Sequence, residues 1–175
     1  MSTRTALVVM AALGFSSLGF AQKVRFDFDH GTDFAKFRTY RLVKIADNPA
    51  VNQLAGQRIV AALEEELAKK GLKKVDTGGD MLVGYQASVS RQTQYTTFND
   101  GFGPGWGWGN SISTTTATTI PVGALTIDMF DPARKQLVFR GTASGTLSDK
   151  PEQNAKKISK AMEKIFEKYP PKVKS

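Results

Sequence analysis

One histidine lies among three aspartates, and no other group of side chains in the sequence comes closer to a catalytic or metal-binding constellation. His30, with Asp27, Asp29 and Asp33, offers an imidazole and carboxylates to a divalent metal ion, or an acid and a base to hydrolysis. Alternation places Asp27 and Asp29 on the polar face of a strand, where capping nearby amides is the simpler role. We expect no metal site, and a metal-dependent or hydrolytic domain centred on residues 27–33 is the alternative hypothesis.

Other catalytic patterns are absent from the sequence. It has no Gly-x-Ser-x-Gly elbow, and the spacing of its carboxylates singles out no glycosidase pair. The glycines of residues 101–109 lack the lysine and the following helix of a phosphate-binding loop. The chain has no cysteine, which excludes thiolate metal sites, disulfides and a lipid-bearing cysteine. We therefore expect a non-enzymatic protein without a cofactor.

Residues 98–110 (FNDGFGPGWGWGN) form a glycine and aromatic segment with an unusual composition. Its four aromatic residues are the candidate binding residues: Phe98, Phe102, Trp106 and Trp108. Exposed aromatic rings can stack on sugars, insert at a membrane interface or anchor a protein partner. The alternative interpretation is a mobile hairpin tip without a ligand.

Several stretches have the two-residue alternation of half-buried strands. Residues 23–29, 39–45 and 81–89 are three of them, and residues 125–130 and 137–144 flank an Asp-Pro-Ala-Arg turn. The Ser- and Thr-rich residues 111–119 are predicted to return antiparallel to the residues that follow Val89. Pro121 and Gly123 are expected to bend the chain into the next hairpin.

The side chains of that hairpin allow two finer predictions. Phe139 is expected to share a buried face with Leu137 and Ala143. Arg140 on the polar face is expected to pair with Asp128 across the hairpin.

Two amphipathic helices are predicted. Asn48 and Pro49 would start the first helix, which ends at Gly71, and residues 148–152 would start the second, which ends before Pro170. The polar face of the second helix has five lysines, which could bind an anionic surface but are also typical of a solvated helix. The predicted fold is α+β, with a mostly antiparallel sheet of about five or six strands and the two helices packed on one face.

The first 21 residues have the features of a secretory signal peptide. Arg4 precedes an apolar run at residues 6–13, and cleavage is expected after Ala21. Residues 22–175 would then form a single exported domain, periplasmic or associated with the outer membrane. The net charge of +8 favours anionic surfaces, and export argues against nucleic acid as a partner.

The motifs from residue 29 onward resemble a bacterial envelope family catalogued as domain of unknown function 4136. The similar pieces are Asp29, residues 33–40 (DFAKFRTY), Gly71-Leu72, residues 80–85 (DMLVGY), residues 123–131, residues 137–141 (LVFRG) and residues 169–171 (YPP). The resemblance implies an exported, lipoprotein-like domain with no assigned activity and no functional residues to transfer. Gln22 stands where family members often have a lipidated cysteine, so we expect no lipid anchor. An envelope protein, a membrane surface and a glycan all remain possible partners.

Overall fold

The computed structural model describes residues 22–45, 51–99 and 113–171. The strands are β1 (Lys23–Phe28), β2 (Thr39–Lys44), β3 (Lys73–Lys74), β4 (Met81–Asn99), β5 (Ser113–Asp131) and β6 (Gln136–Thr146). The helices are α1 (Gln53–Lys69) and α2 (Pro151–Glu167), and a short 3-10 turn, η1, spans Phe34–Lys36.

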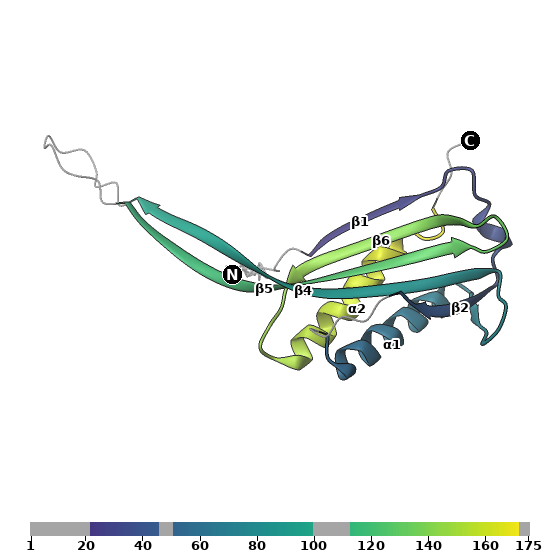
Figure 1. The fold of residues 1–175 in the computed structure, drawn as a ribbon, viewed down its shortest axis with the longest axis horizontal. Helices are drawn as coiled ribbons and strands as arrows, with labels where there is room; N and C mark the ends of the chain where they lie inside the picture. The colour runs from purple at the N-terminus through teal and green to yellow at the C-terminus, as the bar shows by residue number, and fades with distance from the viewer. Residues whose placement is uncertain (1–21, 46–50, 100–112, 172–175) are drawn as a thin grey trace, which may run out of the picture.

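The six strands form one sheet in the order β1-β6-β5-β4-β2-β3. The pairs β1–β6, β6–β5 and β5–β4 are antiparallel, whereas β2 runs parallel to both β4 and β3. Both helices cover the same face of this sheet (Figure 1). The predicted α+β fold with a mostly antiparallel sheet is therefore confirmed.

The core lies between the sheet and the two helices. Its large, fully buried side chains come from both layers: Tyr40, Leu63, Leu67, Met81, Val83, Ile127, Met129, Val138, Phe139, Met162, Ile165 and Phe166. Helix α2 comes close to the sheet at Gly141, where a Cβ atom would overlap the Ile165 side chain. Within the described residues, no helix has both the length and the apolar composition needed to cross a membrane.

Helix α1 begins later than the sequence predicts. Asn52 is its N-cap, and the Asn52 side chain accepts from the amide of Ala55 at 2.8 Å. The predicted start at Asn48 is therefore wrong, because Asn52 meets the same capping requirement one turn later; Asn48 and Pro49 themselves lie outside the described residues. The helix ends as predicted, with Gly71 at φ 80° and the Leu72 amide donating to the Leu67 carbonyl.

Strand β5 continues without interruption through Pro121 and Gly123, so the prediction that these residues separate two strands is wrong. Pro121 pairs with Arg91 of β4, and its carbonyl accepts from the Leu147 amide at 2.9 Å. The N–H and C=O of a strand residue point to the same edge, so the donor that Pro121 lacks would also point away from β4. Proline is tolerated at such a position because the β4–β5 ladder loses no hydrogen bond.

A bulge in β6 changes which side chains are buried. The β5–β6 register shifts between Met129 and Phe130, which pair with Phe139 and Leu137 and leave Val138 as the extra residue. Leu137 therefore lies on the opposite face from Phe139 and is 40% exposed, whereas Val138 is buried. The prediction that Leu137 shares the buried face of Phe139 is wrong for this reason.

Candidate functional site: the β4–β5 arm

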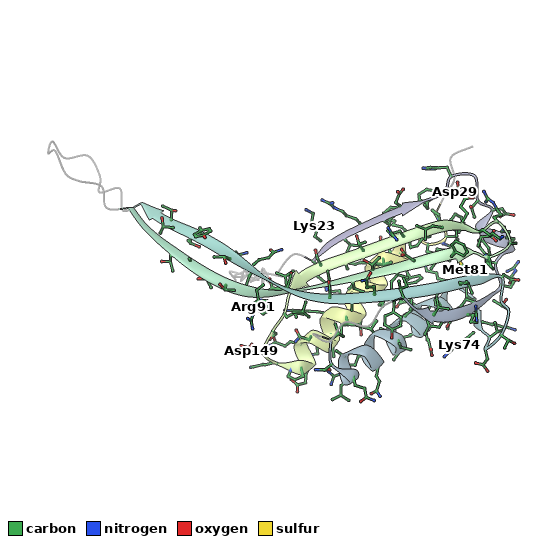
Figure 2. The ribbon with its side chains drawn as sticks, viewed as in Figure 1. Lys23, Asp29, Lys74, Met81, Arg91 and Asp149 are labelled. Carbon is green, nitrogen blue, oxygen red and sulfur yellow. The ribbon has the colours of Figure 1, made fainter. Side chains whose placement is uncertain are left out.

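Strands β4 and β5 continue well beyond the rest of the sheet as a two-stranded arm. Residues 91–99 of β4 pair with residues 113–121 of β5 in nine consecutive antiparallel pairs, from Arg91 with Pro121 to Asn99 with Ser113. At about 3.3 Å per residue the arm is roughly 30 Å long. Figure 1 shows it extending away from the helices, and Figure 2 places Arg91 where it leaves the body.

The side chains of the arm have no apolar layer to pack against. Residues 91–97 and 115–119 are all exposed, and Tyr95 is 72% exposed. Arg91 is the only charged residue among residues 91–99 and 113–121, which are otherwise mostly threonine, glutamine and other uncharged residues. Because a two-stranded hairpin alone is marginal in water, an arm of this composition is suited to contact something else.

The backbone of the arm has two open edges. Pairing of β2 with β4 ends at Tyr85, whose carbonyl accepts from the Ile45 amide at 3.3 Å, and pairing of β6 with β5 ends at Val122. Within the described residues, no strand pairs with the outer edge of either arm strand. The register is regular along the arm, so alternate residues direct both their N–H and their C=O outward: 91, 93, 95, 97 and 99 on β4, and 113, 115, 117 and 119 on β5.

Of the four predicted binding residues, only Phe98 lies in the part of the chain that the structure describes. Phe98 belongs to β4, where its backbone pairs with Thr114. Phe102, Trp106 and Trp108 lie outside the described residues. The structure holds both ends of the intervening segment, Asn99 and Ser113, side by side at the tip of the arm. The assignment of these four aromatic residues to binding stays a prediction.

The aspartates around His30 accept hydrogen bonds from nearby backbone amides. Among the three, Asp29 makes the most contacts. Its carboxylate accepts from the Gly31 amide at 3.0 Å and from the Thr32 hydroxyl at 2.6 Å, and Arg134 lies 3.3 Å away. The hydrogen bond from Thr32 is the main cause of a pKa below the ordinary value for Asp29. These contacts use the carboxylate oxygens that a metal ion would need.

The other members of the predicted cluster are engaged separately. Asp27 accepts from the Phe28 amide, Asp33 caps η1, and the His30 ring lies 4.4 Å from the Phe28 ring. Across residues 22–45, 51–99 and 113–171, no three His, Asp or Glu side chains are grouped so that they could hold a metal ion. The capping role that the sequence favours is thus the one the structure shows.

At the end of the sheet opposite the arm, the buried Asp131 side chain forms an ion pair with Lys36, which is 42% exposed. The Asp131 side chain is 1% exposed, and it accepts from Lys36 Nζ at 2.6 Å and from the Arg134 amide at 3.1 Å. The hydrogen bond from Lys36 is the main cause of a lowered pKa for Asp131. The contact ties η1 to the β5–β6 turn.

A second aspartate at the same end, Asp80, holds the start of β4 against β2. It accepts from the amides of Arg38 and Thr39 at 2.9 and 2.8 Å and from the Thr39 hydroxyl at 2.9 Å. These hydrogen bonds, that of the Arg38 amide first, lower the pKa of Asp80. Both carboxylates link neighbouring segments at this end of the sheet.

Two further predictions concern charged residues. Arg140 pairs with Asp128 through two hydrogen bonds of 2.6 Å, as predicted. On α2, Lys156 and Lys160 are exposed, but Lys157 turns to the body and donates to the Thr146 carbonyl at 2.8 Å. The lysine face of α2 is therefore narrower than predicted.

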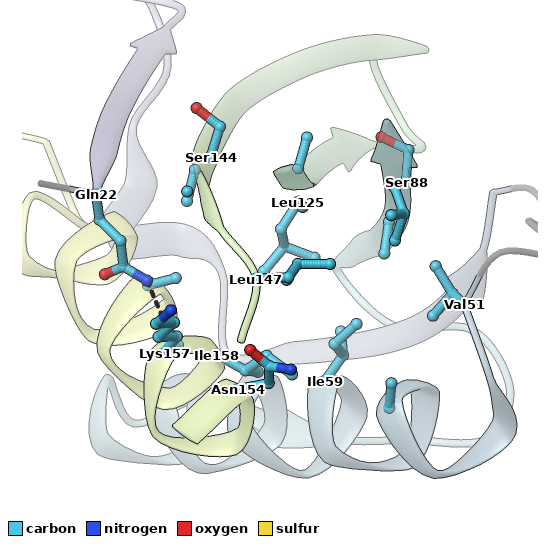
Figure 3. Close-up of a pocket in the computed structure, with 18 of the residues that line it drawn as sticks. Gln22, Val51, Ile59, Ser88, Leu125, Ser144, Leu147, Asn154, Lys157 and Ile158 are labelled. Carbon is cyan, nitrogen blue, oxygen red and sulfur yellow. Dashed lines mark hydrogen bonds between the residues drawn. The ribbon is translucent and has the colours of Figure 1, made fainter. Parts of the chain in front are cut away.

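An apolar cavity of about 210 Å³ opens at the root of the arm, between the sheet and the helices (Figure 3). Val89, Leu125 and Ile158 contribute to its walls, and Gln22 also lines it. The Gln22 amide donates to the Lys157 carbonyl at 2.7 Å. The cavity has an apolar surface but no set of acids and bases that could carry out a reaction.

The predicted antiparallel return of residues 111–119 to the residues after Val89 is confirmed for residues 113–119. The projection of this strand pair beyond the rest of the sheet was not predicted, although the sequence contains a signal for it. Neither residues 90–97 nor residues 113–119 contain a glycine, proline or aspartate that would end a strand. The apolar alternation of residues 81–89 stops after Val89, which is why the strand was predicted to end there. A β-favouring run without a buried face is the pattern of a strand that continues into solvent.

A family model matches residues 24–171, nearly all of the described chain. The chain belongs to the family described as Domain of unknown function (DUF4136). This confirms the resemblance noted from the sequence motifs. No curated protein has significant sequence similarity to the chain.

The solved structures that are similar to this DUF4136 chain have low sequence identity to it. A PDZ domain protein from Parabacteroides distasonis ATCC 8503 has a TM-score of 0.57 at 16% identity, over 86% of this chain and only 36% of that one. The PelC dodecamer from Paraburkholderia phytofirmans has a TM-score of 0.45 at 13% identity, over 83% and 98% of the two chains. A minor lipoprotein from Acinetobacter baumannii has a TM-score of 0.36 at 10% identity, over 75% and 91%. The first of these supports the fold assignment.

Proposed function

We propose that this chain is a non-enzymatic, exported binding protein of the bacterial envelope, whose β4–β5 arm carries the glycine and aromatic segment to a target away from the body. The observation that supports the proposal most is the arm itself. Nine residue pairs hold Asn99 and Ser113, which flank residues 100–112 in the sequence, at the arm's tip, roughly 30 Å from the root. A strand pair of this length with no buried face has a simple explanation if it is a spacer for a contact surface.

The chemistry of the segment fits a binding role. Trp106 and Trp108 alternate with glycines in the sequence, and glycine has a wider range of allowed backbone conformations than other residues. An aromatic ring has a large apolar surface, and the indole N–H also donates a hydrogen bond, so tryptophan suits sugar rings, membrane interfaces and protein pockets alike. Export is supported by the signal-peptide pattern of residues 1–21.

The alternative, a metal-dependent or hydrolytic domain at residues 27–33, finds no support in the site geometry. The Asp29 carboxylate is occupied by Gly31, Thr32 and Arg134, and Asp33 caps η1. We therefore do not propose a reaction.

The proposal is tested with the protein comprising residues 22–175 and a triple variant, Phe102→Ala, Trp106→Ala and Trp108→Ala. Three probes represent the possible targets: vesicles of phosphatidylethanolamine and phosphatidylglycerol, purified peptidoglycan, and solubilised envelope proteins captured by photo-cross-linking. We expect the wild-type protein to bind one probe in co-sedimentation or cross-linking, and the triple variant to lose that binding.

A matched control separates the aromatic segment from general charge attraction. Lys156→Glu with Lys160→Glu alters the exposed lysines of α2 and should leave binding within about twofold, because these side chains lie on the body. Trp106→Ala alone should change the free energy of unfolding by less than about 0.5 kcal/mol. Binding that survives the triple variant but is lost in the lysine variant would contradict the proposal.

A further inference from the structure

Among residues 22–45, 51–99 and 113–171, no strand pairs with the outer edge of β4 along the arm. Residues 91, 93, 95, 97 and 99 direct their N–H and C=O groups away from β5, and Tyr95 lies at the midpoint of this row. Proteins usually protect open strand edges with charges, prolines or bulges, because such edges pair readily with other strands. This edge has one charge, Arg91, at its root, and no proline or register shift.

We propose that two copies of this chain associate by antiparallel pairing of their β4 arm edges, with Tyr95 of each copy opposite Tyr95 of the other. The inference goes beyond the proposed binding function and does not depend on it. In this register Thr93 faces the second copy's Thr97. Each residue of the row then lies opposite another residue of the row in the second copy. Because all of these residues direct their N–H and C=O groups away from β5, every outward backbone group finds a partner.

The side chains fit this arrangement. Tyr95 is 72% exposed in the single chain, although tyrosine is a residue that gains from burial. Placing the two Tyr95 side chains next to each other on one face creates an aromatic cross-strand pair. The threonines on either side are β-branched and pack well on a pleated surface. The paired arms would form a four-stranded sheet, which is more stable in water than two separate hairpins.

Charge favours the antiparallel orientation. The whole chain has a net charge of +8, and nearly all of its charged residues lie outside the arm. Antiparallel arms place the two bodies at opposite ends of the paired region, roughly 30 Å apart. That distance is about three Debye lengths at 0.1 M salt, so the repulsion between the bodies is largely screened. Parallel arms would bring both bodies, and both Arg91 side chains, to the same end.

The β5 edge is a poorer docking strand. At its root, Pro121 has no N–H, and its carbonyl is taken by the Leu147 amide at 2.9 Å. The chain from Leu147 to Pro151 also leaves the sheet there to enter α2. A second strand would meet this connection on the β5 side, whereas β4 has no such neighbour among the described residues. Substitutions on the β4 edge therefore test the pairing of two copies, and the matching substitutions on the β5 edge serve as the control.

Site-directed disulfide formation tests the register, since the chain has no cysteine. Two residues of a hydrogen-bonded antiparallel pair have Cα atoms about 5.5 Å apart, within the usual range for a disulfide. We expect Tyr95→Cys to form a covalent dimer under mild oxidation. Ala117→Cys, at the residue directly opposite Tyr95 on β5, should remain monomeric under the same conditions. Equal dimer yields, or a dimer of Ala117→Cys alone, would overturn the proposal.

Sedimentation equilibrium on the protein comprising residues 22–175 tests the association without a covalent bond. We expect a dimer that dissociates on dilution. Thr93→Pro with Thr97→Pro removes outward donors from β4, leaves the β4–β5 ladder intact, and should give a monomer at every concentration. The matched control, Thr119→Pro with Thr115→Pro, alters the residues opposite them on β5 and should still dimerise.

Circular dichroism of both proline variants checks that the fold is retained. A wild-type protein that is monomeric across the whole concentration series would overturn the proposal, as would a dimer that persists when the β4 prolines are present. Neither result would bear on the aromatic segment, because the triple alanine variant leaves the β4 edge unchanged.

Discussion

At the scale of single residues, the carboxylates of this chain hold turns and brace the sheet. Asp29 and Asp131 both accept from backbone amides and from a neighbouring side chain, and Asp128 pairs with Arg140. The Asp128 pair could be predicted because two strands joined by a tight turn fix which residues face each other. The Asp131 pair could not, because Lys36 is 95 residues away in the sequence.

Asp131→Asn should lower stability near neutral pH, and its effect should fade in acid. The pKa of Asp131 is lower in the folded protein than its ordinary value of 3.8, so the ionised carboxylate stabilises the fold at pH above that value. This contribution is lost as the pH falls through the folded-state pKa. Urea unfolding of both proteins between pH 7 and about pH 2 measures the difference, and a gap that widens in acid would contradict the assignment.

The bulge in β6 gives a matched pair of substitutions, one at a buried residue and one at an exposed residue. Phe139 is 1% exposed and its ring lies 5.6 Å from that of Tyr169, so Phe139→Ala should cost about 3 to 5 kcal/mol. Leu137 is 40% exposed, and Leu137→Ala should cost less than about 1 kcal/mol. Denaturant titration of the two variants decides between this register and the unbroken alternation, which would predict large losses for both.

At the scale of elements, periodicity located the helices and most strands, but their ends depended on details that periodicity does not contain. Asn48 and Asn52 are both good N-caps by residue type, and only the contact between Asn52 and the Ala55 amide distinguishes them. The end of β4 was predicted at Val89 because apolar alternation stops there. The strand continues because β5 supplies its hydrogen bonds, and these do not require a buried face.

The capping assignment makes its own prediction. Asn52→Ala should lower the free energy of unfolding by about 1 kcal/mol, whereas Asn52→Asp, which keeps an acceptor oxygen at the same place, should lower it by much less. Thermal and urea unfolding of the two variants measures the effect. Equal losses from alanine and aspartate would show that Asn52 acts through something other than its side-chain acceptor.

At the scale of the whole molecule, the described chain consists of a helix-covered body and a two-stranded β-arm. The body contains the core and the bracing ion pairs, and the arm contains almost no charge and no core. The family and the fold class could be predicted from motif order and from alternating polarity. The projection of the arm could not, because it depends on where β2 and β6 stop pairing, at Tyr85 and Val122.

Export is a second prediction at this scale. If residues 1–21 are removed on secretion, the purified protein should begin at Gln22, and osmotic shock should release it without detergent, since no cysteine can accept a lipid. N-terminal sequencing and cell fractionation measure both. A retained Met1, or release that requires detergent, would contradict the expectation.

The most direct test of the account is to remove the arm and measure binding to envelope fragments. Ser90 and Val122 are directly paired at the root of the arm. The even-numbered residues of β4 and β5 direct their N–H and C=O groups toward each other, so this is a hydrogen-bonded pair. An Asn-Gly turn can therefore replace residues 91–121 without changing the register of the body. We predict an unfolding free energy within about 1 kcal/mol of the wild-type value, together with loss of the wild-type protein's binding to its envelope probe. A shortened protein that unfolds, or one that folds and still binds, would contradict the claim that the arm is a separate binding element.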